Sequence, residues 1–159
     1  MGDVQIVPLA EAHIPALVHL ELVCFSEPWS ESSLRRELSN PLAHVFVAQV
    51  DGETAGYAGM HCVVDECYVN NVAVFPQYRR RGIGYALVQR LLEQGERLRA
   101  RFLTLEVRAS NQDAMALYQR LGFSVQGIRR DFYIMPTEDG VIMTRTLEKG
   151  EREHEVAGD

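Results

Sequence analysis

The spacing of hydrophobic positions changes several times along the chain and predicts alternating strands and helices. Residues 4–7 are typical of a short strand. A helix follows, because one face of a helical repeat would carry Ile14, Leu17, Leu20, Glu21 and Cys24. Residues 25–29 are expected to form a loop, which holds the only tryptophan. Ser30 can then cap a second helix, which ends near Asn40 because a proline comes next.

The middle of the chain has the pattern of three strands and one long helix. Strands are predicted at 44–50 and 54–63, because these segments flank Asp51-Gly52, a strong signal for a two-residue hairpin turn. A third strand is predicted at 66–74. From Gly82 the apolar residues recur at helical intervals as far as about Leu98.

The last third of the chain returns to a strand pattern. In residues 102–107 the apolar side chains Leu103, Leu105 and Val107 fall on one face of a strand, and Glu106 falls on the other. Residues 110–113 resemble a capping box, which predicts that Ser110 caps a helix carrying Ala114, Leu117, Tyr118 and Leu121, with Gly122 just after its end. Two further strands are predicted near 123–127 and 141–147. The sequence predicts one α/β domain with a mixed sheet over residues 1–148, and a charged, disordered tail at 149–159.

Composition and charge limit the classes of function. The net charge is −6, and residues 148–159 hold five acids and two bases, so that the other 147 residues also carry −3. A mildly acidic body argues against non-specific binding to nucleic acid or to an anionic membrane, and it suits a basic substrate. The first residues do not have the pattern of a signal peptide, and no apolar run reaches the ~20 residues of a membrane span. We therefore expect a soluble cytoplasmic protein.

The three cysteines, Cys24, Cys62 and Cys67, form no CxxC pair. A metal site would need a tighter cluster, or histidines at ligand spacing, so no metal is expected. We expect all three cysteines to be small, buried, reduced residues in a reducing cytosol.

A basic, glycine-containing segment lies between the third strand and the long helix. It runs from Asn71 to Gly84 and places Arg79, Arg80 and Arg81 directly before Gly82. The start of a helix presents unpaired N–H groups and a partial positive charge, so this segment suits a pyrophosphate. It is neither a Walker A loop nor the GxGxxG fingerprint. The same pattern also fits an ordinary turn.

The spacing Arg79-x-x-Gly82-x-Gly84 after an apolar strand resembles the acetyl-CoA motif of the GNAT acetyltransferases, and the order of elements resembles the GNAT fold over nearly the whole chain. The resemblance implies a mixed, mostly antiparallel sheet flanked by helices, with acetyl-CoA as co-substrate. It implies that the pyrophosphate binds to the backbone of Arg80, Arg81, Gly82, Ile83, Gly84 and Tyr85. It also implies that the pantetheine arm binds to the backbone of Val72, Ala73 and Val74.

Four separated segments are similar to the RimI branch of that superfamily, whose members acetylate the N-terminal alanine of a small-subunit ribosomal protein. They are 27–31, 105–123, 128–133 and 138–143. In this family the positions of Glu106 and Tyr118 are the general base, acting through a water, and the general acid, and Asn111 binds the arm of acetyl-CoA. Without the resemblance, Glu106 would be read as a solvated strand residue and Tyr118 as a core residue. Tyr133 and Trp29 are further candidates for contact with substrate, although packing explains each of them too.

The chemistry of amine acetylation is consistent with this pair. An ammonium must lose a proton before it attacks a thioester, and the departing thiolate must gain one. An α-amine has a pKa ~2.5 units below that of lysine, so its deprotonation costs ~3.4 kcal/mol less and one carboxylate suffices more easily. We therefore expect direct transfer to a peptide α-amine, with no covalent intermediate on a cysteine. The alternatives are a lysine or small-molecule acceptor, and a non-catalytic module that binds acetyl-CoA and serves a protein partner.

Overall fold

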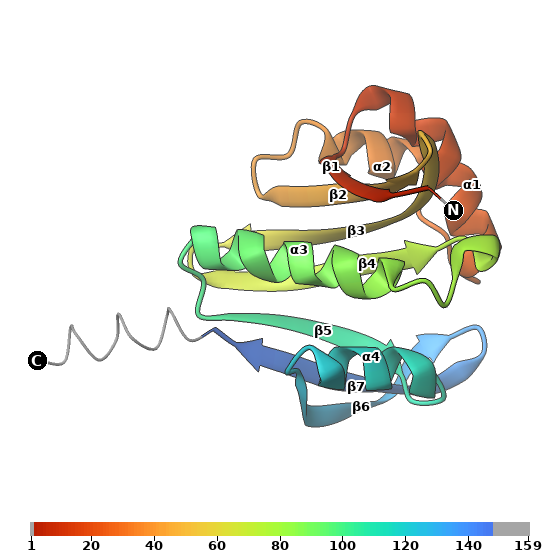
Figure 1. Cartoon of the computed structure of the whole chain (residues 1–159). Helices are drawn as coiled ribbons and strands as arrows, with labels where there is room; N and C mark the ends of the chain where they lie inside the picture. Colours follow the sequence, from red (N-terminus) through yellow and green to blue (C-terminus); the bar gives the residue numbers. More distant parts are fainter. Residues whose placement is uncertain (1, 148–159) are drawn as a thin grey trace, which may run out of the picture. The chain divides into compact units, whose positions relative to one another are not determined.

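A computed structural model describes residues 2–147, and the predicted tail at 149–159 lies outside this range. The strands form one seven-stranded sheet in the order β1-β2-β3-β4-β5-β7-β6 (Figure 1). β4 and β5 pair in parallel, whereas β1 with β2, β2 with β3, β5 with β7, and β6 with β7 are antiparallel. The predicted mixed, mostly antiparallel sheet is confirmed. The chain divides into two compact units, one of residues 2–61 and 70–91 and one of residues 62–69 and 92–147.

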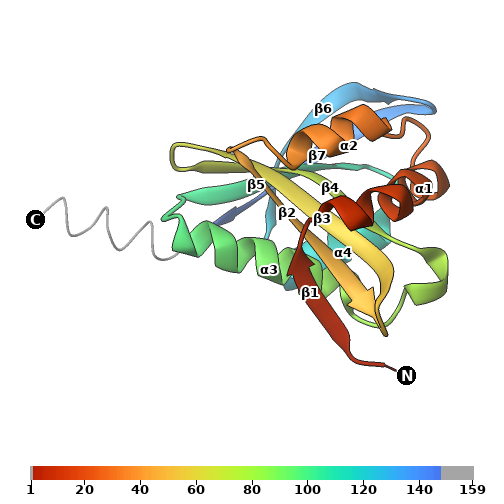
Figure 2. The same ribbon diagram turned by 90° about the horizontal axis from the view of Figure 1, so that it is seen from above.

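The first unit contains the N-terminal elements and the start of the long helix. They are β1 (Val4–Pro8), η1 (Glu11–His13), α1 (Ile14–Cys24), α2 (Glu31–Glu37), β2 (Ala43–Val50), most of β3 (Glu53–Val63), the second half of β4 (Glu66–Val74), η2 (Pro76–Tyr78) and the first turns of α3 (Ile83–Arg97). Within this unit, α1 and α2 lie on one side of the strands and α3 lies on the other (Figures 1 and 2).

Alternation along β2 explains how the strands of this unit serve two helical layers. Val45 and Val47 belong to a core cluster with residues of α1, α2, β3 and β4, namely Ile14, Leu17, Leu20, Leu34, Tyr57, Ala73 and Phe75. Phe46 points to the opposite face, where the guanidinium of Arg90 on α3 lies 4.3 Å from the centre of its ring. Both faces are covered, so most of β2 and β3 is buried.

The second unit contains the C-terminal elements. They are the end of β3, the start of β4, the last turns of α3, β5 (Phe102–Arg108), α4 (Gln112–Arg120), β6 (Ser124–Ile134) and β7 (Thr137–Thr146). In β5 every second side chain is buried, beginning with Leu103, as the sequence predicted. Gly95 lets α3 approach the strands closely, because a Cβ there would lie 2.7 Å from the Cδ1 atom of Leu103.

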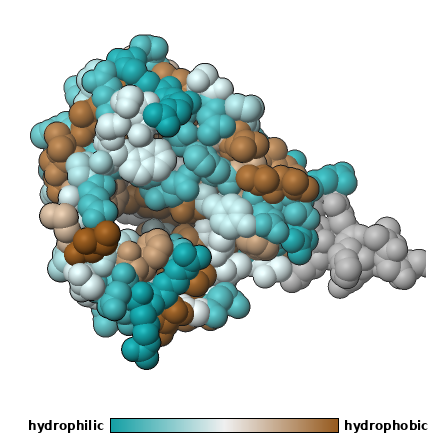
Figure 3. Space-filling model, turned by 180° about the vertical axis from the view of Figure 1, so that it is seen from behind, coloured by the Kyte–Doolittle hydropathy of each residue, from teal (hydrophilic) through white to brown (hydrophobic). Residues whose placement is uncertain are grey.

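Two predictions about the C-terminal elements need correction. The last two strands are longer than expected, since β6 extends to Ile134 and β7 begins at Thr137. β6 is an edge strand with four exposed large hydrophobic residues, Val125, Ile128, Phe132 and Ile134. On the face drawn in Figure 3, hydrophobic residues form separate patches among hydrophilic ones.

The cap of α4 is Asn111 and not Ser110, because the Asn111 side chain accepts the N–H of Ala114 at 3.1 Å.

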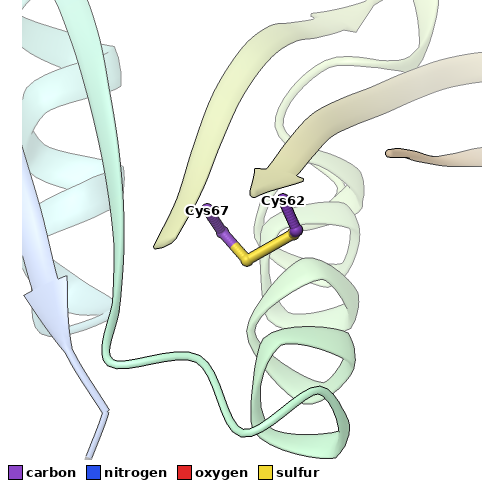
Figure 4. The surroundings of a disulfide bond; sticks show 2 residues. All are labelled: Cys62 and Cys67. Carbon is purple, nitrogen blue, oxygen red and sulfur yellow. A yellow bond between two sulfur atoms is a disulfide. The ribbon is translucent and has the colours of Figure 1, made fainter. Parts of the chain in front are cut away.

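The expectation that every cysteine is a reduced thiol is wrong for two of the three. Cys62 and Cys67 form a disulfide (Figure 4), and Cys24 is the free cysteine. The two bonded residues lie near the facing ends of β3 and β4, on either side of a tight turn in which Val64 has a positive φ of 56°. This turn brings their Cα atoms to 4.1 Å from each other. Among residues 2–147, no helix is long and apolar enough to cross a membrane.

Candidate functional site

The predicted phosphate-binding residues form the connection from β4 to α3 in the first unit. Val72, Ala73 and Val74 lie in β4, beyond Glu66–Tyr68, the residues that pair with β5. The connection turns sharply, because Arg80 and Gly82 have φ angles of 64° and 76°. A Cβ at Gly82 would meet nothing within 4 Å, so the space beside it is open.

The first turn of α3 presents backbone donors at this loop. Gly82 accepts the N–H of Ala86 at 3.0 Å, which is the first hydrogen bond of the helix. Ile83 and Gly84 come before Ala86, in the turn whose N–H groups have no acceptor within a helix. Such donors, together with the positive end of the helix dipole, form a binding site for an anion.

The three arginines of the loop have different surroundings. Arg79 holds the loop to β4, since its Nε atom donates to the carbonyl of Val74 at 3.1 Å, and its Nη2 atom lies 3.5 Å from the sulfur of Cys24. Burial raises the pKa of the Cys24 thiol, although the hydrogen bond and charge of Arg79 act against this. Arg81 lies over the ring of Tyr78 at 5.6 Å. Arg80 and Arg81 are exposed, so their charges face solvent.

Glu106 lies on β5 in the second unit, on the face opposite the buried leucines. Its Oε1 atom lies 3.5 Å from Nε of Arg129 on β6. Its Oε2 atom is buried and makes no hydrogen bond; among residues 2–147 only Arg90 Nη1 shares this condition. An unpaired buried carboxylate oxygen costs free energy, and such atoms are rare in folded proteins unless a ligand or a water binds there.

Tyr133 interacts electrostatically with Glu106, and Tyr118 interacts with Tyr133. Burial raises the pKa of Tyr133, and the negative charge of Glu106 raises it further, while Arg108 lowers it. The guanidinium of Arg108 lies 4.4 Å from the centre of the Tyr133 ring. Burial, followed by the influence of Tyr133, raises the pKa of Tyr118 to about 12. At neutral pH Tyr118 therefore keeps its proton, as a general acid must before it acts.

The loop after β5 is held by Glu138 of β7. The Glu138 carboxylate accepts the backbone N–H and the hydroxyl of Ser110, each at 3.0 Å, and pairs with Arg108 at 3.1 Å. Desolvation alone would raise the pKa of Glu138, but the hydrogen bonds from Arg108 and Ser110 lower it. Ser110 is thus engaged with β7, which explains why it does not cap α4. Asn111, predicted to bind the co-substrate, is exposed, and its Oδ1 atom caps α4.

The sequence-predicted residues lie in both units. Val72–Val74 and the loop and helix start at 79–85 belong to the first, and Glu106, Tyr118 and Tyr133 belong to the second, where Tyr133 interacts with Glu106 and with Tyr118. Sequence reasoning did not assign roles to Arg129 or Gly140, which both lie close to the carboxylate of Glu106. The register explains this, because Arg129 and Gly140 are paired across β6 and β7. In the described part of the chain, no group of three or more His, Cys, Asp or Glu residues could hold a metal ion.

Comparison with known proteins identifies the family. The family model described as "Acetyltransferase (GNAT) family" matches residues 14–123. The ribosomal protein bS18-alanine N-acetyltransferase of Escherichia coli strain K12 is 39% identical over 132 residues, which cover 83% of this chain and 87% of the relative. The N-alpha-acetyltransferase RimI of Mycobacterium tuberculosis is 34% identical over 140 residues, covering 86% and 87%.

A solved structure agrees with these sequence matches. The crystal structure of the ribosomal-protein-S18-alanine N-acetyltransferase from Escherichia coli superimposes with a TM-score of 0.83 and 36% sequence identity, covering 91% of this chain and 94% of that one. The family match, the similarity to two N-acetyltransferases and the agreement of the fold support one conclusion. The chain belongs to the GNAT family of acetyltransferases and is an N-acetyltransferase.

Proposed function

We propose that this protein transfers the acetyl group of acetyl-CoA directly to the α-amine of a peptide, and that the acceptor is the N-terminal alanine of a small-subunit ribosomal protein. The similarity to relatives named for this reaction supports the acceptor. The proposed location is the cytoplasm, where a ribosomal acceptor would be made.

The observation that carries the proposal is the unpaired Oε2 atom of Glu106. Arg129 is beside Oε1, so Oε2 is the carboxylate oxygen that has no hydrogen-bond partner. In the proposed reaction this oxygen takes the proton of the acceptor ammonium through a water. The amine nitrogen then attacks the carbonyl carbon of the thioester with its lone pair, and a C–N bond forms.

Tyr118 completes the proton transfers. As the tetrahedral intermediate collapses, its nitrogen loses a second proton to solvent, the C–S bond breaks and the electron pair of that bond stays on sulfur. The phenol of Tyr118 gives its proton to this thiolate, and solvent later restores the proton. The pKa of about 12 keeps Tyr118 protonated at neutral pH until this step. Tyr133 interacts with both groups. The charge of Glu106 raises the pKa of Tyr133, and Tyr133 in turn raises the pKa of Tyr118.

The first unit supplies the proposed binding residues for acetyl-CoA. Backbone N–H groups at the start of α3, with the exposed Arg80 and Arg81, suit the pyrophosphate. The backbone of Val72–Val74 suits the amides of the pantetheine arm, in the manner of an added strand. Asn111 keeps its proposed role as a further contact through its amide nitrogen, since its Oδ1 atom is occupied by the cap.

The proposed test measures CoA release with two peptides of one sequence. One peptide begins with a free Ala-Arg, and the other has a blocked N-terminus and an internal lysine. We expect turnover of the first peptide only. The variant Glu106→Gln should lower kcat by ~10²–10⁴-fold, as expected for a lost general base. Tyr118→Phe should lower kcat with little change in the KM for acetyl-CoA.

Each other outcome points to a different function. Turnover of the blocked peptide alone would favour a lysine or small-molecule acceptor and would refute the proposed one. Thermal stabilisation by acetyl-CoA without CoA release over a panel of amines would favour a non-catalytic binding module.

A further inference from the structure

A second carboxylate, outside the cluster around Glu106, is completely buried in the first unit. Glu21 lies on the apolar face of α1 beside Leu17 and Leu20, and its exposed fraction is 0%. Its oxygens accept hydrogen bonds from residues on two β-strands and from one residue in a loop. Oε2 accepts from the hydroxyl of Tyr57 on β3 at 2.6 Å and from Nδ2 of Asn71 on β4 at 3.1 Å.

The third hydrogen bond of Glu21 reaches the loop between α1 and α2. The backbone N–H of Trp29 donates to Oε1 at 2.7 Å. We call residues 25–30 the acceptor loop, because Trp29 is a candidate contact with the acceptor substrate. The carbonyl of Glu21 accepts the N–H of Phe25 at 3.0 Å, and Ser30 is the cap of α2, so Glu21 holds the loop at its start and again near its end.

Stability alone does not explain a carboxylate at this position. Burying a charged group is costly, and replacing a whole buried polar network with apolar side chains of similar size is often neutral or stabilising. The three donors are neutral groups, so no ion pair offsets that cost. A buried carboxylate does fix the positions of the groups that donate to it, because each hydrogen bond to a charged acceptor is strong and directional.

The groups that Glu21 fixes are adjacent to proposed substrate contacts. Asn71 directly precedes Val72, the first residue of the proposed pantetheine segment. Trp29 packs against the core cluster, whereas Glu27 and Pro28 in the same loop are exposed. β4 is also held by the hydrogen bond from the N–H of Phe75 to the carbonyl of Ala55. In the acceptor loop, the N–H of Trp29 is bonded to the carboxylate of Glu21 itself.

We propose that Glu21 is a positioning residue that holds the acceptor loop in the conformation that binds the peptide, an inference that rests on the proposed peptide acceptor. Loss of its carboxylate should weaken peptide binding and leave acetyl-CoA binding nearly intact. A hydrogen bond to a charged acceptor corresponds to about 10- to 150-fold in an equilibrium constant, so the KM for the peptide should rise about 10-fold or more.

The test compares three variants of the full chain. Glu21→Met removes the acceptors at similar length, and Glu21→Gln restores one acceptor oxygen for the Trp29 N–H. Tyr57→Phe is the matched control, because it removes a donor to Oε2 and leaves the bond to Trp29. We expect a raised peptide KM in Glu21→Met, partial rescue in Glu21→Gln, and a change below about threefold in Tyr57→Phe. The dissociation constant of acetyl-CoA should stay nearly constant in all three.

Trp29 is the only tryptophan, so its fluorescence reports on the acceptor loop alone. Acrylamide should quench it more strongly in Glu21→Met than in the wild type or Tyr57→Phe. If Glu21→Met does not fold, hydrogen exchange of the Trp29 amide in the wild type decides, and exchange at the rate of an unstructured chain would refute the inference. If the wild type is active and Glu21→Met folds, a peptide KM in the variant equal to that of the wild type would also refute the inference. A wild type that acetylates neither peptide refutes the proposed function instead.

Discussion

Gly140 offers a test of whether Glu106 needs open space at its unpaired oxygen. It lies in β7 opposite Arg108 of β5 and Arg129 of β6. A Cβ at this position would lie 3.2 Å from two carbons of Phe132 and 3.4 Å from Oε2 of Glu106. We predict that Gly140→Ala impairs catalysis much more than it impairs stability.

The effect on stability should be small because two terms oppose each other. The φ of Gly140 is not positive, so alanine can adopt it, and the loss of freedom in the unfolded chain stabilises by ~0.4–1 kcal/mol. Overpacking costs ~1–3 kcal/mol, and the low end applies because Phe132 is 43% exposed and can move. The net loss should be ~0–0.6 kcal/mol, which lowers Tm by about 2 °C or less for a chain of this size.

The effect on kcat should be larger. The added methyl group would lie in van der Waals contact with the oxygen that takes the proton, where the proposed water would otherwise bind, and its tighter contact with Phe132 would shift the surroundings by a few tenths of an ångström. A misplacement of ~1 Å can cost ~10²-fold, so a shift of a few tenths of an ångström should lower kcat by ~10-fold.

The assay is CoA release with the free Ala-Arg peptide, measured together with Tm. Gly127→Ala in β6 is the matched control, because its Cβ would meet only the Cδ1 atom of Ile142, at 3.8 Å. Its kcat should match that of the wild type. Full activity in Gly140→Ala would refute the argument that Oε2 needs this space, and so would an equal loss of kcat in both variants.

Two further predictions follow from the disulfide and from a buried histidine. Under non-reducing conditions the unfolded protein should react with one equivalent of a thiol reagent, at Cys24, and after reduction it should react with three equivalents. Reaction with three equivalents before reduction would contradict the disulfide. Burial lowers the pKa of His13, whose Nδ1 accepts the N–H of Ala10 at 2.9 Å, so the unfolded chain takes up a proton at higher pH than the folded one. The free energy of unfolding should therefore fall as the pH drops below 6.5, by at most ~1.4 kcal/mol per pH unit from this group. Urea titrations of His13→Gln should show a weaker dependence of this free energy on pH. An unchanged dependence would exclude His13 as its source.

The elements that the sequence predicted well have a strong local signal. β4 has the predicted bounds, Glu66–Val74, and the Asp51-Gly52 turn has the positive φ angles, 51° and 80°, that its hairpin type requires. Residues 128–134 were missed because β6 is an edge strand with most side chains exposed, so the sequence has no alternation of buried and exposed positions there. Its register is also shifted between Val125 and Gly127, and between Arg129 and Tyr133. A shift changes which face each side chain takes.

The candidate site was predictable in its residue types and not in its contacts. Alternation in β5 placed Glu106 opposite the buried leucines, and the structure agrees. The neighbours of Glu106 come from β6 and β7, and their approach depends on pairing between distant segments. The disulfide has the same origin, since a spacing of five residues permits a bond between Cys62 and Cys67 without requiring one. The prediction that Ser110 caps α4 was wrong because the Ser110 hydroxyl donates instead to Glu138, which is distant in the sequence.

The carboxylates of Glu21 and Glu106 show how contacts separate a positioning role from a chemical one. Both are acidic residues within largely apolar elements, and the residue pattern without the family resemblance gives no reason to treat them differently. Each oxygen of Glu21 already accepts a hydrogen bond from a neutral donor, three bonds in all. Glu106 has an ionic partner at one oxygen and none at the other. A base must have an oxygen that can take a proton at low cost, whereas a positioning carboxylate must have its oxygens bonded to the groups that it holds, so Glu106 suits the first role and Glu21 the second.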